Sequence, residues 1–183
     1  MNGNLLSTVW PKSQLLHKAV AVGLGVALLT LASKVQVPFW PVPMTLQTLV
    51  VLMIGATAGA RLGGATVLAW LALGALGVPV FATGAGLAYM AGPTGGYLAG
   101  FLLAAVIVGH LADRGFGRTV VSALAMMAAG EVAIFALGTG WLSMLIGAEK
   151  AVAAGFMPFI PAEVLKMALG TAILAAAWKQ AKR

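Results

Sequence analysis

Glu163 and Lys166 are the residues of this chain best placed to do chemistry, because they bring opposite charges into an otherwise apolar C-terminal segment. They stand three positions apart, so both side chains project from one face of a helix. Charged groups inside a membrane helix are costly unless they are paired or face a protein interior. A sheltered carboxylate beside an ammonium could hold a small polar molecule. The alternative is a carboxylate favoured by the helix dipole, with the lysine paired to it or extended toward the membrane surface.

The proline-rich segment Gln36–Met44 supplies a second set of candidates for ligand binding. Its prolines fix the backbone, and Phe39 and Trp40 stand between them. These two aromatic side chains either cover a ligand or anchor the segment at the membrane interface. Thr45 and Gln47 follow directly, and they either cap a helix or form hydrogen bonds with a ligand.

Tyr89 lies in the glycine-rich segment Val78–Thr94. The glycines do not have the spacing of a phosphate-binding loop, and no strand-to-helix unit surrounds them. They allow tight turns or a close approach of the backbone to a ligand. The tyrosine ring either stacks on a bicyclic ligand or lies in the aromatic belt of the membrane interface.

Two further patterns lie inside apolar stretches. A stripe of small residues recurs at a spacing of four, at Ala19, Gly23 and Ala27. Such stripes let helices pack closely, so a stripe that faces out of the bundle is a docking surface for another membrane subunit. Chance is the alternative in a chain this rich in glycine and alanine. Glu131, in the middle of another stretch, must be protonated or paired, with Lys34 or Lys166 as candidate partners.

Composition places the chain among polytopic membrane proteins. Of its 183 residues, 61% are hydrophobic and 8% charged, whereas soluble domains carry about 25% charged residues. The sequence has no cysteine, and its two histidines form no metal-binding cluster. Membrane topology explains the net charge of +7 better than a nucleic-acid partner does. We expect one membrane domain, residues 1–183, without an ATP-binding domain or the motifs of an enzyme.

Six apolar stretches are each near the roughly 20 residues that cross a bilayer. We place them at Leu16–Val35, Thr45–Ala60, Leu62–Phe81, Gly95–Leu111, Thr119–Leu137 and Pro161–Trp178. The segment Trp141–Met157 is also apolar, but Glu149 and Lys150 fall at its centre. We therefore expect an outer interfacial loop with short amphipathic helices there.

Lysine and arginine residues set the expected orientation. With both termini in the cytoplasm, the inner segments carry eight of these residues, and the outer ones carry only Lys34 and Lys150. The positive-inside rule favours this arrangement, with residues 1–15 as a cytoplasmic or interfacial segment. The outer connections are long and rich in Gly, Pro and aromatic residues. Irregular backbone at membrane depth is tolerated only where it is buried or lines a cavity, so these loops predict a lidded, outward-facing pocket.

Four ordered segments of the chain resemble the BioY family, the biotin-specific substrate-capture (S) components of energy-coupling factor (ECF) transporters. These segments are Pro41–Gly63, Leu71–Ala82, Gly92–Phe101 and Pro158–Gly170. In that family the last helix carries an acidic residue and a lysine in a D-x-x-K pattern near the ligand. Glu163 and Lys166 match it, with Glu in place of the usual Asp.

The resemblance implies a six-helix protein of the bacterial cell membrane that binds biotin from the outside and needs no cofactor of its own. It also implies a transmembrane coupling subunit and a pair of ABC ATPases as partners. The family couples through small residues of the first helix, which correspond here to Ala19, Gly23 and Ala27. Biotin itself offers a ureido group to Glu163 and Lys166 and apolar rings to Tyr89, Trp40 and Phe39. A proton-driven secondary transporter, with Glu131 as proton carrier, is the rival interpretation.

Overall fold

The computed structural model of the chain describes residue 5 and residues 15–181, so the expected N-terminal segment 1–15 lies almost wholly outside the described residues. The described part is nearly all helical. Its elements are α2 (Leu15–Lys34), β1 (Gln36–Val37), β2 (Met44–Thr45), α3 (Gln47–Ala75), α4 (Gly86–Met90), α5 (Gly95–Asp113), α6 (Val120–Ile146), α7 (Ala148–Gly155), the 3-10 helix η1 (Met157–Phe159) and α8 (Ile160–Ala181). The predicted class, an all-α integral membrane protein, is confirmed.

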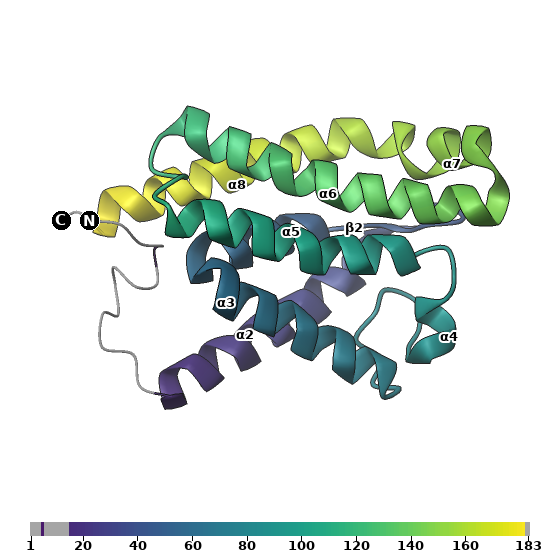
Figure 1. The fold of residues 1–183 in the computed structure, drawn as a ribbon, viewed down its shortest axis with the longest axis horizontal. Coiled ribbons are helices and arrows are strands. Elements are labelled where there is room, and N and C mark those ends of the chain that lie inside the picture. Colours follow the sequence, from purple (N-terminus) through teal and green to yellow (C-terminus); the bar gives the residue numbers. More distant parts are fainter. Residues whose placement is uncertain (1–4, 6–14, 182–183) are drawn as a thin grey trace.

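The long helices form one bundle. The helix α5 packs between α3 and α6, while α8 packs on α6 and α3, and α2 crosses the outside of α3 (Figure 1). The first described turn of α2 and the last turn of α8 lie at one end of the long axis, and α4 and α7 lie at the other (Figure 1). Because the described chain starts and finishes at the same end of the bundle, it crosses the bundle an even number of times.

The helix α3 contains two of the predicted spans. Five helical segments are long and apolar enough to cross a membrane, but α3 turns back at Gly59, where φ is 80° and ψ is 176°. A Cβ on Gly63 would lie 3.2 Å from the Cα of Gly55, although residues eight apart in a straight helix are separated by roughly 12 Å. The halves of α3 therefore pack side by side and correspond to the predicted spans Thr45–Ala60 and Leu62–Phe81.

Two predicted boundaries are wrong. The third span ends at Ala75 rather than Phe81, because Gly77 adopts a φ of 94° in a Schellman motif, with the Val78 N–H donating to the Leu73 carbonyl at 3.0 Å. The helix α6 continues to Ile146, well past Leu137.

A packing glycine, rather than a loop glycine, explains the longer α6. A Cβ on Gly138 would lie 2.2 Å from a ring carbon of Tyr97, so this glycine lets α5 and α6 approach each other closely. The expectation for Trp141–Met157 is therefore wrong at its start, because residues 141–146 belong to α6. The short helices α7 and η1 follow, as expected for the rest of this segment.

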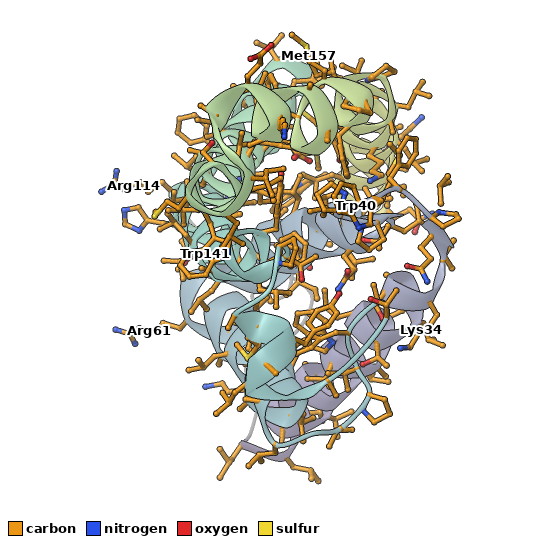
Figure 2. The ribbon with its side chains drawn as sticks, turned by 90° about the vertical axis from the view of Figure 1, so that its right-hand side faces the viewer. Lys34, Trp40, Arg61, Arg114, Trp141 and Met157 are labelled. Atoms are coloured by element: carbon orange, nitrogen blue, oxygen red, sulfur yellow. The ribbon has the colours of Figure 1, made fainter. Side chains whose placement is uncertain are left out.

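The outer connections are tied to the bundle. The strands β1 and β2 pair antiparallel, Gln36 with Thr45 and Val37 with Met44. The Ser33 hydroxyl donates to the Val80 carbonyl at 2.9 Å, and the Lys34 ammonium donates to the Phe81 carbonyl. Figure 2 shows this end of the molecule with the loops and short helices in front of the long helices. The loop after α3 is thus held against the outer end of α2.

Candidate functional site

Glu163 and Lys166 lie in the first two turns of α8 and point into the bundle. Their exposed fractions are 4% and 7%, and the Lys166 Nζ stands 2.8 Å from the Glu163 Oε1. The predicted common face is therefore correct, and it turns toward protein rather than lipid. The N-terminal position of Glu163 also places its charge where the helix dipole favours an anion.

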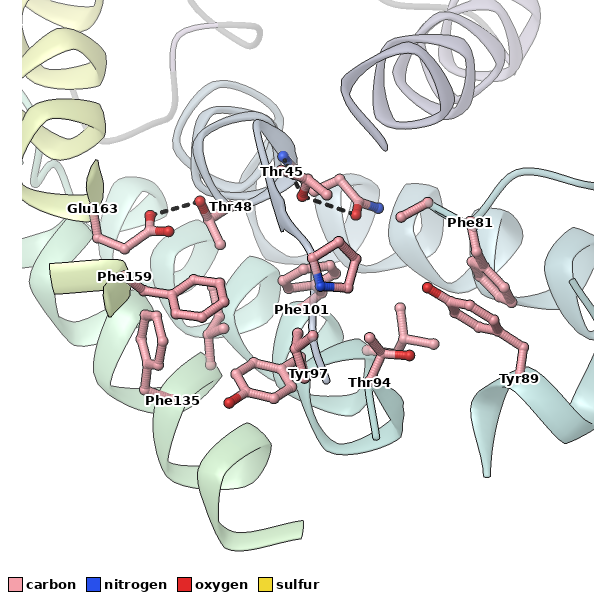
Figure 3. A pocket seen from close by; sticks show the side chains of 16 residues that line it. Thr45, Thr48, Phe81, Tyr89, Thr94, Tyr97, Phe101, Phe135, Phe159 and Glu163 are labelled. Carbon is pink, nitrogen blue, oxygen red and sulfur yellow. Dashed lines mark hydrogen bonds between the residues drawn. The ribbon is translucent and has the colours of Figure 1, made fainter. Parts of the chain in front are cut away.

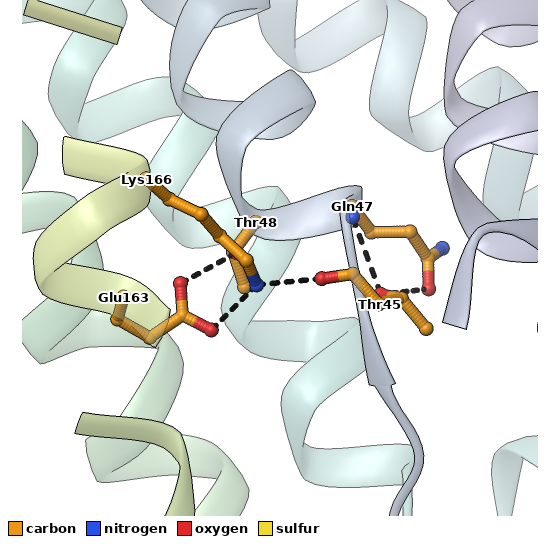
Figure 4. A network of polar contacts seen from close by, with 5 residues as sticks. All are labelled: Thr45, Gln47, Thr48, Glu163 and Lys166. Atoms are coloured by element: carbon orange, nitrogen blue, oxygen red, sulfur yellow. Dashed lines mark hydrogen bonds and ion pairs between the residues drawn. The ribbon is translucent and has the colours of Figure 1, made fainter. Parts of the chain in front are cut away.

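The ammonium of Lys166 connects α8 to the start of α3. It donates to the Thr45 carbonyl at 2.6 Å, to the Thr48 Oγ1 at 3.0 Å and to the Glu163 Oε1 (Figure 4). The Thr48 hydroxyl in turn donates to the Glu163 Oε2 at 2.7 Å. A lysine ammonium has three N–H donors, so all of them are used. The network is complete without a ligand, and Lys166 cannot bond one unless it releases a protein partner.

Gln47 presents the free donor of the site. Its backbone N–H donates to the Thr45 Oγ1 at 3.2 Å, and the Thr45 hydroxyl donates to the Gln47 Oε1 at 3.0 Å (Figure 4). This pair of bonds fixes the side-chain amide. The Gln47 Nε2 is buried and has no hydrogen-bond partner among the residues that the structure describes. A buried donor of this kind is costly to leave unpaired, so it suits an acceptor supplied by a ligand.

These polar groups line one wall of an elongated pocket between the helices. Glu163 and Thr48 lie at one end, and Phe81 and Tyr89 at the other (Figure 3). The Phe81 and Tyr89 rings stack with centroids 5.1 Å apart and an interplanar angle of 18°. Most of the remaining wall is apolar, formed by Val42, Pro43, Ala82, Tyr97, Leu98, Phe101, Ile134, Phe135 and Phe159. The chemistry of this lining suits a flat apolar body with a few polar groups along one side.

The structure brings most of the predicted binding residues together. Glu163, Thr45, Gln47 and Tyr89 all line the pocket, and Lys166 lies directly behind Glu163. These residues come from α8, from β2 and α3, and from α4, so three distant parts of the sequence converge on one cavity.

Phe39 and Trp40 do not reach this pocket. Trp40 is 83% exposed. Phe39 is 41% exposed, with its ring centroid 6.2 Å from that of Phe159. The segment between β1 and β2 turns Val42 and Pro43 toward the cavity instead. The position of Trp40 fits the alternative of an aromatic anchor at the membrane interface.

Thr48 and the pocket aromatics are functional candidates that the sequence did not reveal. Thr48 stands three residues after Thr45, and this helical spacing was the available signal. The aromatic wall residues carried no signal, because in apolar spans a phenylalanine that lines a pocket looks like one that faces lipid or core. The members of this group are Phe81, Phe101, Phe135 and Phe159.

The stripe of small residues on α2 faces away from the bundle. Ala19, Gly23 and Ala27 are all exposed, and a Cβ on Gly23 would meet nothing within 4 Å. Beside the stripe, α2 also exposes large apolar residues such as Val20 and Leu24. This outer face of α2 is separate from the pocket.

The fold and the site together define a membrane protein that binds a small, partly apolar molecule between its helices. The model of the BioY family matches residues 5–183, and the chain belongs to this family.

Relatives named as biotin transporters support the assignment. The chain is 38% identical over 153 residues to the probable biotin transporter BioY of Pyrococcus horikoshii, covering 83% of this chain and 90% of the relative. It is 34% identical over 160 residues to the biotin transporter BioY of Thermotoga maritima, covering 86% of this chain and 94% of the relative. The crystal structure of the S-component for biotin from an ECF-type ABC transporter has the same fold, with a TM-score of 0.77 at 24% identity over 90% of this chain and 92% of that one.

Proposed function

We propose that this protein binds biotin in the pocket beside Glu163 and serves as the substrate-binding subunit of an ECF-type transporter for biotin uptake. The observation that carries the proposal is the buried acceptor and donor pair, Glu163 and Gln47, on the wall of an apolar, aromatic pocket. Biotin has an apolar fused bicycle, a ureido group with two N–H donors and an anionic valerate tail. Its apolar rings and its polar groups suit the residues that line the cavity.

The geometry supports a division of roles among the polar residues. A carboxylate offers about four acceptor positions, and the protein bonds to Glu163 occupy two of them. Glu163 therefore accepts a ureido N–H, with the bicycle against the rings of Phe135 and Phe159. The Gln47 amide donates to the valerate carboxylate farther along the pocket, toward Tyr89. Lys166 is a positioning residue, because its three donors hold Glu163, Thr45 and Thr48 in place.

The outer face of α2 is the proposed contact with a transmembrane coupling subunit, through Ala19, Gly23 and Ala27. Their exposure is what this role requires, since small residues let another helix approach closely. Two ABC ATPases would supply the energy. The comparisons favour this mechanism over the proton-driven alternative, because the structural relative is a component of an ABC transporter.

The proposed location is a bacterial cell membrane with both termini in the cytoplasm. The start of α2 and the end of α8 share one end of the molecule (Figure 1). The turn of α3 and the end of α5 also meet at one level, since the Ala60 N–H donates to the Asp113 Oδ2 at 3.0 Å. The adjoining Arg61 and Arg114 are thereby placed at the same end of the bundle, as the positive-inside rule requires of cytoplasmic connections.

Equilibrium binding to the detergent-solubilised protein, measured by titration calorimetry, tests the site. Biotin should bind, desthiobiotin should retain much of the affinity because it keeps the ureido group, and lipoate should bind far more weakly. Replacing Glu163→Gln removes one charge-assisted hydrogen bond, worth about 1.5–3 kcal/mol, or about 10- to 150-fold in affinity. The same change at the exposed Glu149 is the matched control. Unchanged affinity of the Glu163→Gln variant would show that the site is misplaced.

Uptake measurements test the proposed coupling face separately. Gly23→Leu should leave biotin binding unchanged and reduce uptake in cells that also express the coupling subunit and ATPases, because it puts a bulky side chain on the docking stripe. Gly140→Leu, at another exposed helical glycine, is the control. Equal uptake by both variants would exclude the stripe as the contact.

A further inference from the structure

Glu131 is a buried carboxylate for which the binding site gives no role. It lies in the interior of α6 and is 6% exposed. Both of its carboxylate oxygens are buried and lack a direct hydrogen-bond partner within the described part of the chain. It lies within electrostatic range of Glu163 and Lys166. Lys34, the other cation considered from the sequence, is engaged with the Phe81 carbonyl at the outer end of α2.

The side-chain donors of Lys166 and Thr48 are occupied. Lys166 has given its three N–H bonds to Thr45, Thr48 and Glu163. The Thr48 hydroxyl proton points to the Glu163 Oε2. An ionised Glu131 would therefore be a buried charge without a hydrogen-bond donor, which is strongly unfavourable.

The other elements packed on α6 leave this balance unchanged. From α3, which also packs on α6, the charged residue Arg61 is exposed. From α5, the Tyr97 hydroxyl donates to the Gly155 carbonyl at 2.7 Å. From α7, Glu149 and Lys150 are exposed. The titratable groups of α8 that face Glu131 are Glu163 and Lys166. Two carboxylates thus share one ammonium, and that ammonium bonds to Glu163.

We propose that Glu131 keeps its proton and donates it in a hydrogen bond to Glu163, and that it thereby acts as a positioning residue for ligand binding. Glu163 is the ionised partner because Lys166 and Thr48 already donate to its two oxygens. An O–H from Glu131 would bring it a third donor without adding negative charge. The proton stays on Glu131 throughout, so this role differs from proton-driven transport.

The consequence is a link between pH and ligand affinity, which rests on the proposed binding of biotin at Glu163. When Glu131 loses its proton at alkaline pH, two negative carboxylates face each other. Glu163 then loses a donor and is repelled from its position. Biotin affinity should therefore be constant near neutral pH and should fall as the pH rises.

Calorimetric titration with biotin between about pH 6 and about pH 10, on the full-length protein in detergent, tests the link. The unaltered protein should lose about tenfold in affinity at the alkaline end, equivalent to about 1.4 kcal/mol. Glu131→Gln should keep the neutral-pH affinity within about threefold and lose the pH dependence, since an amide donates the same bond but has no proton to lose. Glu131→Leu should bind weakly at every pH. The Glu149→Gln control should keep the original profile.

Infrared spectroscopy of the ligand-free protein supplies a readout independent of biotin. A protonated carboxyl C=O band should be present at neutral pH, absent in Glu131→Gln and shifted in Glu131→Asp. A protein that shows this band but binds no biotin would contradict the proposed function and leave the protonation of Glu131 standing. A band unaffected by either variant, or an alkaline loss of affinity that persists in Glu131→Gln, would overturn the inference. If Glu131→Gln does not fold, the Glu131→Asp band decides.

Discussion

Replacing Lys166→Met should lower the stability of the protein and leave the shape of the pocket nearly unchanged. Methionine keeps most of the aliphatic length but removes the ammonium and its bonds to Thr45, Thr48 and Glu163. It leaves Glu163 as a buried charge without its cation. Removing one partner of a buried ion pair costs about 3–5 kcal/mol, which corresponds to a fall of roughly 10 °C in the midpoint of thermal unfolding.

The double variant Glu163→Gln with Lys166→Met separates the charge penalty from the lost contacts. Replacing both members of a buried ion pair is far less harmful than removing one, so stability should recover by about 2 kcal/mol or more over Lys166→Met alone. Biotin affinity should not recover, because the glutamine removes the carboxylate acceptor. The ligand-free unfolding midpoint, followed by tryptophan fluorescence, and calorimetric biotin binding report the two properties independently.

Two results would refute this reasoning. If Lys166→Met unfolds at the same temperature as the unaltered protein, the ion pair is not the structural link that its geometry indicates. If the double variant is no more stable than Lys166→Met, the loss comes from the contacts to Thr45 and Thr48 rather than from an unpaired charge. Lys150→Met, at an exposed lysine on α7, is the matched control and should leave both properties unchanged.

Two further substitution pairs test the packing and the pocket walls. Gly138→Ala should destabilise the protein by about 1–3 kcal/mol, because the new Cβ would lie 2.2 Å from the Tyr97 ring, whereas Gly140→Ala meets nothing within 4 Å and should be neutral or slightly stabilising in thermal unfolding. Equal effects of these two changes would contradict the close approach of α5 and α6. Tyr89→Ala should weaken biotin binding about tenfold through loss of an aromatic wall, while Trp40→Ala should leave calorimetric affinity within about twofold. The reverse order would show that the outer segment closes over the ligand.

The charged part of the site was predictable because charge is conspicuous in an apolar chain. Glu163 and Lys166 stand out against a background with 8% charged residues, and their spacing fixes a common face. The aromatic part was not predictable, since phenylalanine is equally suited to lipid, core and pocket. The structure alone distinguishes Phe135 and Phe159, which line the cavity, from Phe116, which is exposed.

The predicted helix boundaries were wrong at two glycines, because a glycine can either end a helix or allow close packing inside one. Gly77 and Gly138 both follow apolar runs in the sequence. The first adopts a positive φ and ends a helix, while the second lies inside α6 against an aromatic ring. The difference depends on the partner across the interface, which sequence spacing does not contain. The exposed position of Trp40 was not predictable for a related reason, because the direction of its side chain depends on how the backbone turns between β1 and β2.

The polar network, which is complete without a ligand, predicts that the pocket discriminates between vitamins with similar tails. Lys166, Thr45 and Thr48 satisfy one another before a ligand arrives, so little ordering remains to oppose binding. The unfilled positions are an acceptor on Glu163 and the donor of Gln47. Lipoate can supply a carboxylate for the donor, but its ring has no N–H for the acceptor. Because a site built around a hydrogen bond rejects analogues that lack the matching group, Glu163 should contribute more to selectivity than the aromatic walls do.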